Sequence, residues 1–133
     1  MEFDVKPGLV GEKTELVTGE NLATRYGSGG AAVYATPAMI GLMENASVNA
    51  VDPGLPEGWC TVGTRLDVRH LKATPPGMTA RARAVLEVVE GRRLVFKVEA
   101  FDDQEKIGEG THERFIINLS EFLAKVDKKI QQK

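Results

Sequence analysis

Three side chains that can bind a carbonyl group or move a proton stand at intervals that one fold could bring together. Thr36 precedes Pro37, and Glu44 follows eight residues later as the one charged side chain between Thr36 and Val51. Eight helical residues span about 12 Å, so Thr36 and Glu44 can flank one small substrate group but cannot bond to each other. His70 lies further along the chain and can donate or accept a proton near neutral pH.

Glu44 is the most informative of these residues, because its neighbours on a helix are apolar. Four of them lie within roughly 40° of it on a helical wheel: Pro37, Ile40, Val48 and Val51. A carboxylate among such neighbours costs several kcal/mol unless it is paired. The position suits either a structural ion pair or a catalytic group, and the pattern leaves both readings open.

Thr36 and His70 can each be interpreted as a structural residue as well as a catalytic one. We expect Thr36 to be the N-cap of a helix whose first residue is Pro37, at the positive end of the helix dipole, where an oxyanion is stabilised. His70 shares the even-numbered face of its strand with three apolar residues, Val62, Leu66 and Val68. A histidine on such a face is commonly a core residue. The predicted helix is the natural cover of that face, so the three candidate residues are expected to converge there.

The other reactive residue types carry weaker signals. Neither of the two histidines lies in an HxH or HExxH pattern, so we expect no metal site and interpret His112 as structural. Cys60 has no identifiable activating neighbour and needs no role. The segment Gly27–Gly30 resembles a phosphate-binding loop only superficially, because no Gly-Lys-Ser/Thr follows it.

The hydrophobic period divides the chain into elements that would position these residues. A buried helix is predicted over 36–51, ended by Asp52-Pro53-Gly54, and a short amphipathic helix is predicted to start at Ser120 as its cap. Alternation with period two predicts strands at 14–18, 61–71, 78–88, 94–101 and 107–117. This order predicts an α+β fold in which an antiparallel sheet curls around one long central helix. Exposed sheet edges and a half-covered helix favour a homodimer.

The amino-acid composition indicates the broad class of protein. A chain of 133 residues with 42% hydrophobic and 27% charged residues predicts a single folded domain over residues 1–133. Its formal charge of −2 gives no electrostatic reason to expect a nucleic-acid partner. The longest apolar stretch, 31–50, is interrupted by polar residues, so no membrane span is expected. Without a recognisable signal peptide, we expect a cytoplasmic protein.

Five blocks of the sequence occur in an order and spacing typical of one enzyme family. They are Ala35–Glu44, Val68–His70, Ala73–Gly77, Val89–Leu94 and Ile107–Arg114. Together they resemble the fluoroacetyl-CoA thioesterase family of hotdog-fold enzymes, over most of the chain from about Gly27 to the C-terminal helix. The hotdog fold is a helix wrapped by an antiparallel sheet, and it normally dimerises.

The resemblance implies hydrolysis of a short acyl-CoA thioester, with Thr36, Glu44 and His70 at the catalytic positions. Gly63 falls on a family position whose backbone contacts the acyl group, and Arg114 on a position near the substrate. CoA belongs to the substrate, so no separate cofactor is implied. Whether Glu44 is nucleophile or general base, and which subunit supplies each group, stays open.

Two alternatives and one departure from the family accompany this interpretation. A non-catalytic acyl-CoA-binding or regulatory hotdog domain would bind ligand without turnover, and a hotdog hydratase or dehydratase would change enoyl absorbance without releasing thiol. The fluoroacetyl-specific enzyme has a longer, aromatic-containing lid segment before its catalytic helix. Here Gly19–Tyr34 is short and carries alanine and glycine, so hydrolysis is expected without selectivity for fluoroacetyl.

Overall fold

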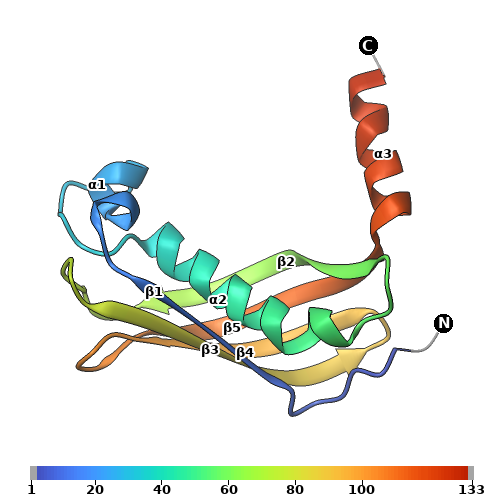
Figure 1. Cartoon of the computed structure of the whole chain (residues 1–133), viewed down its shortest axis with the longest axis horizontal. Coiled ribbons are helices and arrows are strands. Elements are labelled where there is room, and N and C mark those ends of the chain that lie inside the picture. The colour runs from blue at the N-terminus through green and yellow to red at the C-terminus, as the bar shows by residue number, and fades with distance from the viewer. Residues whose placement is uncertain (1–2, 132–133) are drawn as a thin grey trace.

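A computed structural model describes residues 3–131 as one curled antiparallel sheet that holds a long helix against its concave side (Figure 1). The five strands lie in the order β1-β3-β4-β5-β2. The strands are β1 (Val10–Leu16), β2 (Trp59–His70), β3 (Thr79–Glu90), β4 (Arg93–Phe101) and β5 (Lys106–Asn118). The helices are α1 (Ala23–Tyr26), α2 (Thr36–Val51) and α3 (Leu119–Gln131), with the 3-10 turns η1 (Gly19–Asn21) and η2 (Asp52–Gly54). This order confirms the predicted arrangement, although β1 begins four residues earlier than predicted.

The core lies between α2 and the middle of the sheet. The apolar face of α2 buries Met39 and Met43 completely, against alternating inward residues of β3 and β4. Four of those residues on β3 are Ala80, Ala82, Ala84 and Leu86, whose mostly small side chains let the helix lie close to the strand. The backbones of β1 and α2 approach each other even more closely, because a Cβ on Gly11 would lie 2.0 Å from the carbonyl oxygen of Ala46.

The start of α2 differs from the prediction. Ala35, with extended backbone angles φ −75° and ψ 141°, is the N-cap, and no side chain makes a capping hydrogen bond. Thr36 is therefore the first helical residue, and its hydroxyl bonds elsewhere. Pro37 still occupies the first turn, which explains why the chain begins a helix here. The predicted end of the helix at 52–54 is confirmed, as the turn η2.

A β-bulge in β2 corrects the predicted set of inward-facing residues. Gly63 pairs with Arg114, but Arg65 pairs with the preceding residue of β5, Glu113, so the register shifts between them. Before the shift the odd-numbered residues face α2, and after it the even-numbered residues do. Val62, paired with the exposed Phe115, therefore lies on the opposite face from His70.

The C-terminal helix α3 stands away from the sheet (Figure 1). The Asn118 side-chain oxygen accepts from the backbone N–H of Glu121 at 3.1 Å, so Asn118 caps this helix where Ser120 was predicted to do so. Three apolar residues of its predicted stripe are exposed: Leu123, Val126 and Ile130. Over residues 3–131, no helix is long and apolar enough to span a bilayer.

Candidate functional site

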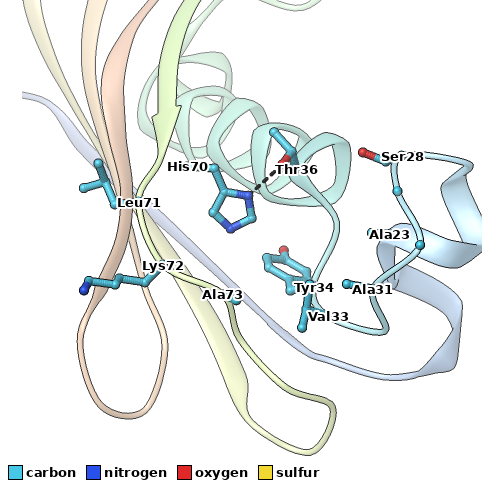
Figure 2. Close-up of a pocket in the computed structure, with 12 residues that line it drawn as sticks. Ala23, Ser28, Ala31, Val33, Tyr34, Thr36, His70, Leu71, Lys72 and Ala73 are labelled. Carbon is cyan, nitrogen blue, oxygen red and sulfur yellow. Dashed lines mark hydrogen bonds between the residues drawn. The ribbon is translucent and has the colours of Figure 1, made fainter.

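Thr36 and His70 lie in direct contact where the start of α2 meets the end of β2. The Thr36 hydroxyl and His70 Nδ1 are 2.7 Å apart, a hydrogen-bond distance (Figure 2). Burial lowers the pKa of His70, and the neighbouring backbone of Lys72 opposes that shift only in part. The imidazole is therefore mainly neutral at pH 7. In the described part of the chain, His70 Nε2 is a buried atom without a hydrogen-bond partner, which leaves it free to bind a ligand or exchange a proton.

A pocket of about 360 Å³ opens beside this pair (Figure 2). Thr36, His70 and Tyr34 line it together with a wall of small residues, Ala23, Ser28, Gly29, Gly30, Ala31 and Ala73. The Tyr34 hydroxyl donates to the Glu15 carboxylate, and the Tyr34 side chain is buried, so this ring is fixed in place. The segment before α2 thus places one aromatic ring in the pocket lining, although most of its contribution is small.

Glu44 lies in a second group of residues, near the middle of α2. Its Oε2 atom is 3.7 Å from Nη1 of Arg114, and its side chain is 38% exposed. A Cβ added to Gly63 would lie only 3.0 Å from the same Oε2 atom. Gly63 therefore lets the carboxylate approach the backbone of β2. The structural ion-pair reading of Glu44 and the catalytic reading are both compatible with this position.

Arg114 projects from β5 into a buried network of hydrogen bonds. Its Nε donates to Thr61 Oγ1 at 2.8 Å, and its Nη2 donates to the Thr61 carbonyl at 2.9 Å. Its Nη1 lies 3.1 Å from Nε2 of His112. Burial lowers the pKa of Arg114, while the nearby carboxylates of Asp52 and Glu44 oppose that shift.

Sequence reasoning missed the role of Thr61 and Asp52 in this network. Asp52 was interpreted only as a helix stop, yet its carboxylate accepts from the Thr61 hydroxyl at 2.6 Å and from the Thr61 backbone N–H at 3.1 Å. His112 is fully buried, and its Nε2 atom joins the same network through Arg114. No sequence signal joins these positions, because they come from different segments of the chain.

The structure therefore brings the candidates together as two groups. Thr36 contacts His70, whereas Glu44 contacts Arg114 and approaches Gly63. Eight residues along α2, or about 12 Å, separate the two groups. The expected convergence of Thr36, Glu44 and His70 is seen within this chain only for the first and last of them. Among residues 3–131, no group of three or more His, Cys, Asp or Glu side chains could hold a metal ion.

Comparisons with known proteins agree on one family. The model of the fluoroacetyl-CoA-specific thioesterase family matches residues 17–120. The fluoroacetyl-CoA thioesterase of Streptantibioticus cattleyicolor is 50% identical over 97 residues, which cover 73% of this chain and 70% of that protein.

Solved structures give the same result. The structure of the fluoroacetyl-CoA thioesterase FlK superposes with a TM-score of 0.87 at 40% identity, covering 94% of this chain and 97% of that one. A point mutant of FlK in complex with fluoroacetate and CoA gives a TM-score of 0.82 at 39% identity, covering 89% and 99%. The chain therefore belongs to the fluoroacetyl-CoA-specific thioesterase family and has the hotdog fold.

Proposed function

We propose that this protein hydrolyses the thioester of a short acyl-CoA to a free acid and CoA, using Thr36, Glu44 and His70. The observation that carries the proposal is the Thr36–His70 hydrogen bond of 2.7 Å beside a pocket, in a chain of a thioesterase family. A hydroxyl, a neutral imidazole and a carboxylate supply the groups that thioester hydrolysis needs.

Thr36 and His70 act at the thioester itself. The Thr36 hydroxyl lies at the first turn of a 16-residue helix, where the helix dipole favours negative charge. It therefore positions the carbonyl and helps to stabilise the oxyanion that develops on it. The backbone N–H of Gly63 lies with Glu44 in the other group of residues, so it joins this oxyanion from the second subunit of the proposed dimer. Because the Thr36 hydroxyl donates to the oxyanion, it accepts from Nδ1–H of His70, and Nε2 of the neutral imidazole holds a lone pair. Nε2 takes up a proton from solvent water and passes it to the CoA sulfur when the carbon–sulfur bond breaks.

Glu44 supplies the attack on the thioester carbon. As a general base it takes a proton from water, whose oxygen attacks the carbonyl; as a nucleophile its own oxygen forms an anhydride that water then cleaves. Single-turnover hydrolysis in water labelled with oxygen-18 identifies the nucleophilic route when water cleaves the anhydride at the Glu44 carbonyl. The first acid released then carries an unlabelled Glu44 oxygen and the label enters Glu44, whereas the general-base route labels the acid. Trapping the anhydride with hydroxylamine identifies the nucleophilic route when water instead attacks the acyl carbon.

We propose a homodimer whose pockets lie at the interface between subunits. Within residues 3–131, β2 pairs only with β5 and leaves its other edge free, and Leu66 on that strand is 41% exposed. Glu44 is also partly exposed, and it lies about two helical turns from Thr36. A second copy paired along β2 would cover these surfaces and bring its own catalytic groups to them. Light scattering tests the dimer, because a mass of 14.5 kDa in solution would contradict it.

The acyl group is proposed to be small and not restricted to fluoroacetyl. Five of the twelve residues that line the pocket beside His70 are alanine or glycine, so that part of the wall provides space but no shape that would select one substituent. The substrate therefore comes from the short acyl-CoA esters. A cytoplasmic location is proposed with this substrate, and the free thiol of Cys60 is compatible with a reducing compartment.

A thiol-release assay over acyl-CoA esters of increasing chain length tests the function. The wild-type protein should release CoA thiol from the short esters, and Glu44→Ala should lower that rate by about two orders of magnitude or more. Binding of acyl-CoA by calorimetry without thiol release would instead favour the regulatory alternative. A change in enoyl absorbance without thiol release would favour a hydratase.

A further inference from the structure

Arg114 is held against Glu44 by groups that the proposed mechanism does not use. We propose that Asp52, Thr61 and His112 are positioning residues, which aim the Arg114 guanidinium at Glu44 and so fix the reactive carboxylate. This inference rests on the proposed function and deepens it. It assigns roles to three residues that touch neither the Thr36–His70 pair nor the pocket beside it.

Thr61 links a carboxylate to the guanidinium. Its hydroxyl oxygen accepts from Arg114 Nε at 2.8 Å, while the hydroxyl proton is donated to Asp52 Oδ1 at 2.6 Å. The Thr61 main chain repeats this pattern, because its N–H donates to Asp52 Oδ2 at 3.1 Å and its carbonyl accepts from Arg114 Nη2 at 2.9 Å. One residue therefore joins both oxygens of Asp52 to two nitrogens of Arg114. This double link fixes the rotation of the guanidinium plane.

His112 fixes the third nitrogen. Its Nδ1 lies 2.9 Å from the carbonyl oxygen of Arg65, which can only accept, so Nδ1 carries the hydrogen. Nε2 is then an acceptor and receives a hydrogen bond from Arg114 Nη1 at 3.1 Å. The imidazole is fully buried and neutral in this arrangement. A protonated His112 would present N–H to N–H and break the contact.

These bonds use three of the five guanidinium N–H groups, and Nη1, which keeps a second N–H, lies toward Glu44. The Glu44 Oε2 atom is 3.7 Å from Nη1, beyond hydrogen-bond distance, and the guanidinium side chain is only 7% exposed. The cation therefore attracts the carboxylate without occupying its lone pairs. Those lone pairs stay available for water or for the thioester carbon. Because Asp52 ends α2 while Thr61 and Arg114 lie on β2 and β5, the network also sets the distance between helix and sheet at Glu44.

Thr61→Val tests this inference, because it removes the hydroxyl and keeps the shape. We expect kcat to fall about tenfold to a hundredfold, with KM for the acyl-CoA changed less than about threefold. Thr61→Ser keeps the hydroxyl and should return kcat to within about threefold of wild type. Thermal melting checks that each variant folds. If Thr61→Val does not fold, the Asp52→Asn variant tests the inference instead, and its kcat should fall about threefold to tenfold.

The Glu44→Gln background separates positioning from a general structural role. If Thr61 acts through Glu44, Thr61→Val should cause no further loss in a protein that already carries Glu44→Gln. The comparison uses the residual thiol release of Glu44→Gln, measured at high enzyme concentration. An equal loss in both backgrounds would overturn the inference, as would a folded Thr61→Val variant with wild-type kcat while Glu44→Gln is strongly impaired. Full activity of Glu44→Gln would overturn the proposed mechanism together with this inference.

Discussion

Gly63 and His70 face the same side of β2, toward α2, although an odd number of positions separates them. The Gly63 Cα approaches Glu44 Oε2, since a Cβ there would lie 3.0 Å from that atom, and His70 Nδ1 lies 2.7 Å from the Thr36 hydroxyl. A regular strand would turn one of the two residues away. The bulge between Gly63 and Arg65 removes that conflict. β2 therefore contributes a residue to each of the two groups of site residues along α2.

Replacing Gly63 by alanine should impair catalysis more than folding. The added methyl group would lie 3.0 Å from Glu44 Oε2 and 3.1 Å from an edge carbon of the His112 ring, so the flexible carboxylate must move. The carboxylate must give by a few tenths of an ångström, less than the misplacement of about 1 Å that can cost about a hundredfold in rate. We expect kcat for a short acyl-CoA to fall about threefold to tenfold, measured by thiol release.

Gly41→Ala on the same helix is the matched control. A Cβ at Gly41 meets no atom within 4 Å, and the backbone there is helical. The substitution should therefore stabilise the protein by about 0.5–1 kcal/mol in urea unfolding and leave kcat unchanged. If Gly63→Ala behaved in the same way, the closeness of Gly63 to Glu44 would have no catalytic meaning.

The fold was largely predictable because its signals are local. The apolar pattern of α2, Pro37 at its start and Asp52-Pro53-Gly54 at its end all act within one turn of the chain. The turn at Gly91 was predictable for the same reason, since its φ of 61° is readily adopted by glycine. The inward face of β2 was not predictable, because a bulge depends on pairing with another strand rather than on the period of one.

The site was predictable only where a residue type is unusual among its neighbours in the sequence. Glu44 stood out as the single charge in an apolar helix, whereas Thr61 resembles any other strand threonine. Its contacts with Asp52 and Arg114 arise from segments that the sheet brings together. The cap at Thr36 was predicted wrongly because threonine before proline fits both a cap and a first helical residue. The hydroxyl bonds to His70, and that contact comes from the tertiary fold.

Thr36 substitutions should separate the catalytic role of the hydroxyl from helix capping. Since no side chain caps α2, Thr36→Val should change the free energy of unfolding by less than about 0.5 kcal/mol. It removes the hydrogen bond to His70, so kcat should fall about tenfold to a hundredfold. Thr36→Ser retains the hydroxyl and should stay within about fivefold of wild type. A large loss of stability in Thr36→Val would restore the capping interpretation.

Both histidines should make the protein less stable as the pH falls through 6. Burial lowers the pKa of His70 and the pKa of His112, so the unfolded chain takes up protons more readily than the folded one. Stability then rises with pH over that interval, and the stabilisation from the neutral imidazoles is lost as the pH falls below the unfolded value of about 6.5. Urea unfolding at pH 7.5 and 5.5 measures the difference.

The His70→Gln and His112→Gln variants assign that pH dependence. Each removes one titrating group, so each should reduce the loss of unfolding free energy between pH 7.5 and 5.5. The chain has only two histidines, so the double variant should lose most of the dependence in this interval. A double variant with an unchanged dependence would attribute the effect to carboxylates instead.

Mixing two inactive variants tests whether Glu44 and His70 of different subunits share a pocket. Within one chain His70 contacts Thr36, and Glu44 lies about two helical turns away from that pair. If a site takes Glu44 from one subunit and His70 from its partner, a heterodimer of Glu44→Gln and His70→Asn contains one intact site. Random reassociation of equal amounts should then restore about a quarter of the wild-type activity, because about half of the dimers are mixed. If each site lies within one chain, every site in the mixture carries one defect, and no activity returns.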